Sequence, residues 1–262
     1  MPLVCDLNYK KYGEEGSIVI ILHGLFGMLD NWSSFARQLG HHYQVFVVDQ
    51  RNHGKSCHSE EMNYDLMVAD LIYFMDAQGL QKAHWVGHSM GGKVAMNLAL
   101  THPERTNSLT VLDIAPRAYA PVHTPIFQAL KSIDLNQEWT RSEIADKLAQ
   151  KIPRPAIVQF LMKNLAREGV KRFRWKMNLE AIHRAYESIN EAACPAKRFF
   201  GSVLFVKGGR SDYIQQKDME AIRMYFPNAK LSIIAEAGHW LHAEKPKELM
   251  ELLTEFIGEL EI

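Results

Sequence analysis

Short apolar runs recur along the chain and alternate with stretches that carry apolar residues at helical spacing. Residues 17–22 read Ser-Ile-Val-Ile-Ile-Leu and contain no charge, which is typical of a strand buried on both faces. Such strands, separated by helices, predict an open, mostly parallel central sheet flanked by helices. After an edge strand at residues 5–12, the predicted strands cover residues 17–22, 43–48, 82–86, 108–112, 202–206 and 229–234.

The alternation breaks between about residues 117 and 199. Several prolines punctuate this segment, and we predict no strand in it. We interpret it as a helical cap, residues 117–199, inserted into a core of residues 1–116 and 200–262; ordinary helices beside the sheet are the alternative. Helices are predicted in the cap at residues 126–135, 141–151, 155–167 and 177–189, and in the core at residues 32–39, 64–80, 93–100, 217–226 and 246–260.

Length and composition narrow the class of protein. The 262 residues, 47% of them hydrophobic, suffice for one large α/β domain with an insertion. Lys plus Arg equals Asp plus Glu at 30 each, so no overall field favours nucleic acid or an anionic membrane. The N-terminus does not resemble a secretory signal, and no apolar run approaches the roughly 18 residues of a membrane span. We expect a cytoplasmic monomer or homodimer that acts on a small molecule.

The cysteines add an expectation about the redox environment. Cys5, Cys57 and Cys194 are odd in number and widely spaced. Free thiols in a reducing compartment are therefore expected, and a disulfide framework is not.

One motif provides a candidate nucleophile. Residues 87–91 fit the pattern G-x-S-x-G, with a predicted strand before them and a helix rich in small apolar residues after them. In that context the sharp turn raises the serine hydroxyl above the sheet and directs the first helix amides toward it. Ser89 is therefore the predicted nucleophile, whereas the same residue in an ordinary glycine-flanked loop would have no role.

The other strand ends supply the partners that a serine nucleophile requires. Ligands bind at the carboxyl ends of the strands in open parallel sheets. His239, after the last strand, is the predicted base, and His242, His88 and His53 are its competitors. The three-residue spacing of His239 and His242 resembles a metal pair only weakly, because no carboxylate follows at ligand spacing. We expect no metal and no cofactor.

The acid and the oxyanion hole are less well determined by the residues alone. Asp113 and Asp212 both follow strands, and either could accept a hydrogen bond from the second imidazole nitrogen of His239. The predicted oxyanion donors are the backbone N–H groups of Met90 and Leu25, with Phe26 as an alternative to Leu25.

Together these motifs resemble the α/β-hydrolase superfamily over essentially the whole chain, and within it the YbfF-type bacterial carboxylesterases with a small helical cap. The resemblance implies a serine carboxylesterase or thioesterase that cleaves small to medium acyl esters through an acyl-enzyme. The strings that carry it are His23-Gly24-Leu25-Phe26-Gly27, Asp49-Gln50-Arg51-Asn52-His53-Gly54-Lys55-Ser56, Gly87-His88-Ser89-Met90-Gly91-Gly92-Lys93, Leu112-Asp113-Ile114-Ala115-Pro116, Arg174-Trp175-Lys176-Met177-Asn178-Leu179 and Gly238-His239.

The resemblance also bears on the acid. Most of the superfamily has its acid in a frame like G-x-x-D-P-x-V, and residues 208–214 place Ser211 at the acid position. The YbfF-like subgroup similarly has serine there and takes its acid from the preceding strand. That alignment implies Asp113 as the acid, with Ser211 able to bridge it to His239. A shift of the alignment by one residue places Asp212 at the acid position instead.

Two other functions fit parts of the sequence. A carbon–carbon bond hydrolase shares this architecture and would need basic cap residues, for which Arg154, Lys171, Arg172 and Arg174 are candidates. A non-catalytic ligand-binding module on the same fold is the second alternative. For the esterase, Phe26, Trp175 and Trp240 are the expected pocket residues, while the facing of Phe127, Phe160 and Tyr186 is not readable from the sequence.

Overall fold

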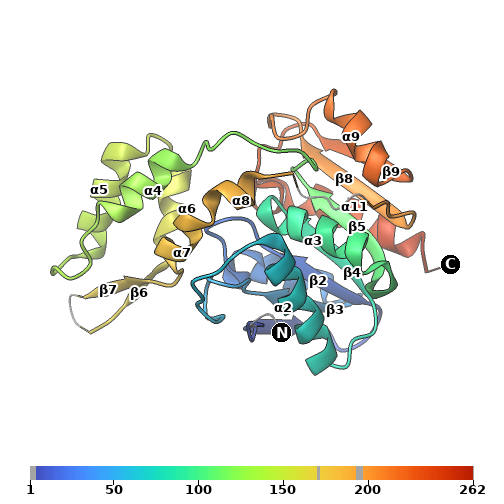
Figure 1. Ribbon diagram of the computed structural model, residues 1–262, viewed down its shortest axis with the longest axis horizontal. Helices are drawn as coiled ribbons and strands as arrows, with labels where there is room; N and C mark the ends of the chain where they lie inside the picture. The colour runs from blue at the N-terminus through green and yellow to red at the C-terminus, as the bar shows by residue number, and fades with distance from the viewer. Residues whose placement is uncertain (1–3, 170–171, 193–196, 262) are drawn as a thin grey trace.

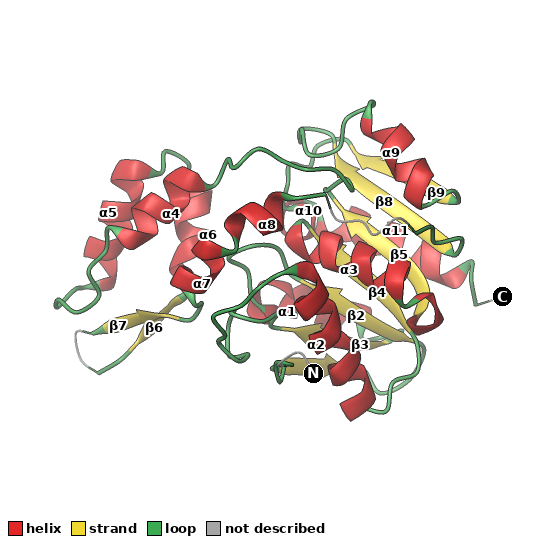
Figure 2. Ribbon diagram, in the orientation of Figure 1, coloured by secondary structure: helices red, strands yellow, loops and turns green. Residues whose placement is uncertain are grey.

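A central sheet of seven strands organises the computed structural model, which describes residues 4–169, 172–192 and 197–261 (Figures 1 and 2). The strand order is β1-β3-β2-β4-β5-β8-β9; β1 runs antiparallel to β3, and every other neighbouring pair is parallel. The prediction of a mostly parallel sheet is confirmed. The strands are β1 (Tyr9–Tyr12), β2 (Ile18–Leu22), β3 (Gln44–Val48), β4 (Ala83–His88), β5 (Thr106–Leu112), β8 (Ser202–Gly208) and β9 (Ala229–Ile234).

Helices cover both faces of this sheet. Successive side chains of a strand point to opposite faces, so Val19 and Ile21 of β2 pack in the layer with α1 and α11, while Ile20 and Leu22 pack in the layer with α2 and α3. None of the described helices is long and apolar enough to cross a membrane. The core helices are η1 (Leu29–Trp32), α1 (Ser33–Leu39), α2 (Tyr64–Ala77), α3 (Met90–Thr101), η2 (Pro103–Arg105), α9 (Asp218–Tyr225), α10 (Leu241–Glu244) and α11 (Pro246–Gly258).

The segment between β5 and β8 lies to one side of the sheet (Figure 1). We call residues 117–199 the insertion; their division from the core as a cap stays a prediction. The expectation that it lacks strands is wrong, because β6 and β7 form an antiparallel hairpin. The helix predicted to reach residue 167 ends at Met162, because the following residues pair in this hairpin. Its elements are α4 (Thr124–Lys131), α5 (Arg141–Lys151), α6 (Pro155–Met162), β6 (Leu165–Arg167), β7 (Phe173–Trp175), α7 (Leu179–Arg184) and α8 (Tyr186–Asn190).

The cysteines differ from the sequence-based expectation. Cys5 and Cys57 form a disulfide that joins the N-terminal segment to the loop after β3. Their sequence separation of 52 residues does not indicate this contact; in the structure the two segments lie side by side, and the Cys57 N–H donates to the Asp6 carbonyl. The prediction of free thiols is therefore wrong for this pair, and the inferred reducing compartment loses that support. Cys194 lies outside the described residues.

A buried ion pair fixes the loop between β3 and α2. The Arg51 guanidinium donates from Nε and Nη2 to the two carboxylate oxygens of Asp70, each at 2.7 Å, and both side chains are 1% exposed. Asp70 Oδ1 also accepts the Cys5 N–H at 2.6 Å. The carboxylate thus ties the N-terminal segment and the loop to helix α2, beneath the carboxyl ends of the strands.

Asp70→Asn should destabilise the protein by about 3–5 kcal/mol, because a buried guanidinium would then face a neutral amide. Urea denaturation measures the change in unfolding free energy. Asp76→Asn is the matched control, since its ion pair with Arg105 has a carboxylate that is 61% exposed and should contribute less than about 1 kcal/mol. Equal effects of the two substitutions would contradict this account.

Candidate active site

The turn between β4 and α3 carries Ser89 in a strained conformation. Its φ is 53°, in the left-handed region, where a non-glycine residue costs about 1–3 kcal/mol. The turn also excludes side chains on both sides of the serine. A Cβ on Gly87 would lie 2.4 Å from the Gly91 carbonyl oxygen, and one on Gly91 would lie 2.5 Å from the Leu22 oxygen. The two glycines are therefore sterically required by the sharp turn that exposes Ser89.

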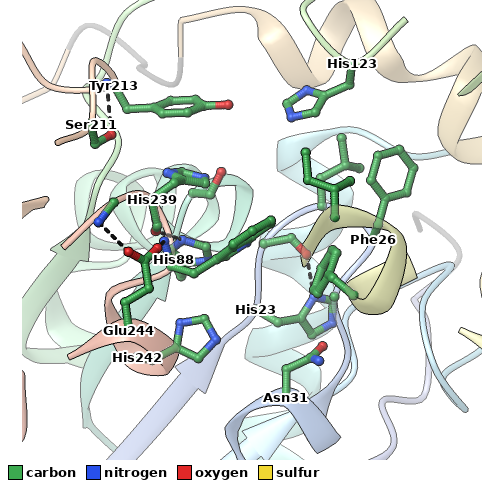
Figure 3. Close-up of a pocket in the computed structure, with 18 of the residues that line it drawn as sticks. His23, Phe26, Asn31, His88, His123, Ser211, Tyr213, His239, His242 and Glu244 are labelled. Atoms are coloured by element: carbon green, nitrogen blue, oxygen red, sulfur yellow. Dashed lines mark hydrogen bonds between the residues drawn. The ribbon is translucent and has the colours of Figure 1, made fainter. Parts of the chain in front are cut away.

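Ser89 lines a cavity of about 400 Å³ at the carboxyl ends of the strands. Figure 3 shows His239 and Tyr213 on one side of this cavity, and Phe26 and His123 on the other. The core and the insertion both contribute walls to this cavity, and its lining combines apolar side chains with polar and charged ones, as in a small-molecule site. The insertion supplies His123, Ile126, Arg154, Ile157, Phe160 and Leu161.

The candidate acid and base meet beside the cavity. Asp113, fully buried at the end of β5, has its Oδ2 atom 2.7 Å from His239 Nδ1. Ser211 Oγ donates to the same oxygen, and the Gly208 N–H donates to Oδ1 at 3.0 Å. Asp212 is exposed, and its carboxylate forms no hydrogen bond or ion pair with the described residues. The structure thus brings Asp113, and not Asp212, to His239.

Two aromatic neighbours fix the orientation of His239. The Tyr213 ring stacks on its imidazole at a centroid distance of 4.0 Å. Burial holds the pKa of His88 well below its usual value, so this ring is neutral, and its Nε2–H donates to the His239 carbonyl at 2.8 Å. Since His239 Nδ1 faces Asp113, the nitrogen left for Ser89 is Nε2. No direct hydrogen bond joins Ser89 and His239, both of which are described; such contacts often tighten only when substrate binds.

The loop after β2 offers backbone donors near Ser89. Residues 24–27 form a β-turn closed by the Gly27 N–H and the Gly24 carbonyl at 2.9 Å. The N–H groups of Leu25, Phe26 and Met90 donate to no described residue, so all three remain available to a ligand. Leu25 and Met90 line a small extension of about 30 Å³ beside Ser89.

The structure places some of the predicted pocket residues in the cavity and others outside it. Phe26 and Trp240 line the cavity, but Trp175 does not; Phe160, whose facing was not readable from the sequence, lines it as well. Trp175 was a wrong prediction because it pairs with Leu165 in the β6–β7 hairpin and packs, half-buried, against the hydrophobic core. Of the basic residues proposed for the insertion, Arg154 lines the cavity, whereas Arg172 and Arg174 are exposed outside it and Lys171 lies outside the described residues.

No sequence motif indicates His123, which precedes α4 and lines the cavity. Its backbone N–H donates to the Tyr186 hydroxyl at 2.7 Å, and its Nδ1 lies 3.0 Å from the same oxygen. Burial lowers its pKa to about 4, so it is neutral at pH 7. Its position depends on how the insertion folds back over the sheet.

His239 and His242 do not form the metal pair that their spacing weakly suggested. The His242 ring stacks on Trp32 at 4.0 Å, while His239 engages Asp113. Across the described part of the chain, no three His, Cys, Asp or Glu side chains are grouped so that they could hold a metal ion.

Comparison with known proteins shows the family to which this chain belongs. Residues 17–246 match the family model of the α/β hydrolase fold, and the chain belongs to that family. It is 35% identical to esterase YbfF of Escherichia coli over 94% of both chains. It is 36% identical to mouse sn-1-specific diacylglycerol lipase ABHD11, covering 98% of this chain and 86% of the lipase. Among solved structures, a marine microorganism esterase is 41% identical with a TM-score of 0.93, covering 96% of this chain and 99% of that one.

Asp113→Asn should lower kcat by on the order of 10⁴-fold, because an amide cannot hold His239 in the required tautomer or stabilise its cation. Asp212→Asn, the matched exposed change, should leave kcat near the wild-type value. Initial rates on one p-nitrophenyl ester measure both, with circular dichroism as the control for folding. Near-wild-type turnover by Asp113→Asn would eliminate Asp113 as the acid.

Buried histidines should make the protein sensitive to acid. Burial lowers the pKa to about 4 for His23 and His123 and to about 3 for His53 and His242. As the pH falls below about 6.5, the unfolded chain binds protons that the folded chain excludes, so the unfolding free energy falls. Each such histidine contributes a slope of roughly 1.4 kcal/mol per pH unit in this window.

Denaturant titrations at pH 7, 6 and 5 measure this loss. His23→Gln should show a shallower dependence on pH than the wild type, because it lacks one of the neutral rings. The same unfolding free energy at pH 7 and pH 5 in the wild type would contradict the account.

Proposed function

We propose that this protein is a serine carboxylesterase that cleaves small to medium acyl esters or thioesters through a Ser89–His239–Asp113 triad. The observation that carries the proposal is the 2.7 Å contact between Asp113 and His239 at the edge of the cavity that Ser89 lines. The similarity to proteins named esterase and lipase supports the same reaction class.

The reaction follows from the roles of these groups. Ser89 Oγ attacks the acyl carbonyl carbon while His239 Nε2 removes the hydroxyl proton. The oxyanion is held by the N–H groups of Met90 and of Leu25 or Phe26, which have no competing acceptor among the described residues. His239 then gives the proton to the departing alcohol or thiol. Water, deprotonated by His239, cleaves the acyl-enzyme and releases the acid.

The buried carboxylate explains why His239 can carry a transient positive charge. Asp113 is fully buried and receives hydrogen bonds from Ser211 and Gly208, so it remains fixed beside the imidazole. Ser211 thus steadies the carboxylate that orients the base. Its hydroxyl donates to Asp113, so this proton is not available for a hydrogen bond to the substrate.

The walls of the cavity favour an ester over an acidic carbon–carbon substrate. The surfaces contributed by α6 of the insertion are mainly apolar, with Ile157, Phe160 and Leu161. Arg154 is the one of the four proposed basic residues that lines the cavity within the described chain, and Arg210, at the same mouth, lies within 4.0 Å of Glu236 and Glu244. A substrate with an apolar acyl group fits these walls better than a dianion.

Incubation with a fluorophosphonate probe should label the wild-type protein at one site, and Ser89→Ala should abolish the labelling. Rates on p-nitrophenyl esters and acyl-CoAs of graded chain length then define the acyl group and compare esters with thioesters. Absence of labelling, or labelling that persists in Ser89→Ala, would favour the non-catalytic binding module.

A further inference from the structure

The insertion reaches the turn that carries the candidate oxyanion donors, and Phe26 is the point of contact. Phe26 is the third residue of the turn at residues 24–27 and has a φ of 60°, while Leu25 has no positive φ. This is the geometry of a type II turn, in which that position normally belongs to glycine. A phenylalanine stays in this region only if neighbouring groups hold it there.

The core holds the first residue of the turn. His23 Nε2 accepts the Gln50 N–H at 3.0 Å, so the ring proton of this neutral histidine is on Nδ1. Nδ1–H donates to the Gly24 carbonyl at 2.8 Å, the same oxygen that closes the turn. These hydrogen bonds hold Gly24, and none of them involves Phe26, the strained third residue of the turn.

The insertion holds Phe26 at two points. Its ring packs edge-on against Phe127 of α4, with a centroid distance of 5.0 Å. Its carbonyl accepts a hydrogen bond of 2.7 Å from Asn164 Nδ2, between α6 and β6. Phe26 and Asn164 are 138 residues apart in the sequence, so only the folded position of the insertion creates this bond.

Asn164 donates its side-chain N–H to the turn, while its side-chain oxygen stays unpaired in the part of the chain that the structure describes. Its side chain is fully buried, and its Oδ1 atom has no hydrogen-bond partner among the described residues. A buried acceptor without a donor is destabilising; an apolar side chain of similar size would remove this one but would leave the buried Phe26 carbonyl without its donor. The only hydrogen bond that the amide makes within the described chain is the one to Phe26, which points to the turn as the reason for its presence.

We infer that Asn164 is a positioning residue for the oxyanion hole. By holding the Phe26 carbonyl, it keeps Phe26 in the left-handed conformation and so keeps the N–H groups of Leu25 and Phe26 directed toward the carbonyl of the substrate. Without this bond the turn relaxes by rotation on either side of Phe26, and the donors move away. The inference rests on the proposed esterase function and makes the geometry of the hole depend on the insertion.

Asn164→Leu separates this role from a structural one. It should lower kcat about 10- to 100-fold, since a displaced donor or an ångström of misplacement has an effect of that size. KM should change little, because the interaction matters mainly in the transition state. The unfolding free energy should change little, because Asn164 Oδ1 is removed as an unpaired acceptor while the buried Phe26 carbonyl becomes one. Asn164→Ala is the second variant if Asn164→Leu does not fold.

An alkylboronic acid gives an independent readout, because its tetrahedral adduct with Ser89 places an oxygen in the oxyanion hole. Its inhibition constant should rise in Asn164→Leu by the factor by which kcat/KM falls. Asn178→Ala is the matched control. Asn178 also lies in the insertion and contacts Asn52 Oδ1 and the Ser59 carbonyl, each at 3.4 Å, but does not touch the turn. It should lower stability and leave kcat unchanged.

Wild-type kcat and boronate affinity in a folded Asn164 variant would overturn the inference. An equal fall in kcat for Asn178→Ala would also overturn it, because general docking of the insertion would then be responsible. Fluorophosphonate labelling of the wild type distinguishes these results from failure of the proposed function. If the wild type is labelled at Ser89 and Asn164→Leu leaves kcat unchanged, the protein is an esterase whose oxyanion hole does not depend on Asn164.

Discussion

The buried carboxylate of Asp113 is the constraint on which the site depends. A charge removed from water needs compensation from hydrogen bonds and an opposite charge. Asp113 receives donors from Gly208 and Ser211 of the neighbouring strand end and from the His239 ring. Because the donors lie at or after the ends of β8 and β9 while Asp113 follows β5, the pairing of these three strands must be correct before the carboxylate is satisfied. The orientation of the base therefore depends on correct assembly of the sheet.

Three residues with strained backbone conformations lie at the same edge of the sheet. Phe26, Ser89 and Asp113 all have φ between 52° and 60°, and each follows a strand that enters the site. Strained residues persist where the surrounding structure holds them firmly, and they mark places where a group must point in one direction. The Ser89 N–H donates to the Leu112 carbonyl at 3.0 Å, hydrogen bonds hold Asp113, and contacts from the insertion hold Phe26. The insertion thus does more than form a wall of the cavity.

The sequence predicted the parts of the fold and site that follow from local pattern. Buried β-branched runs gave the parallel sheet, and the carboxyl ends of its strands identified Ser89 and His239 as candidates. Asp113 required an argument from family resemblance at Ser211, because two carboxylates follow strands and the pattern does not rank them. The structure puts Asp113 beside His239 and leaves Asp212 exposed.

The features that the sequence did not predict depend on contacts between segments that are far apart in the chain. The hairpin of β6 and β7 has strands of three residues, too short for a periodic signal, and its pairing removed Trp175 from the pocket. The Cys5–Cys57 disulfide, His123 and Asn164 acquire their roles only when segments far apart in sequence meet. None of these residues belongs to a motif, so tertiary structure alone reveals them.

The central claim is that Ser89 forms an acyl-enzyme in this cavity. The most direct measurement is rapid acid quench of the protein during turnover of p-nitrophenyl acetate, followed by mass spectrometry of the intact chain and its peptides. The account predicts an acetyl group on the peptide containing Ser89, formed in a burst with the release of p-nitrophenol. Steady turnover with no acyl adduct, or an adduct on another residue, would contradict it.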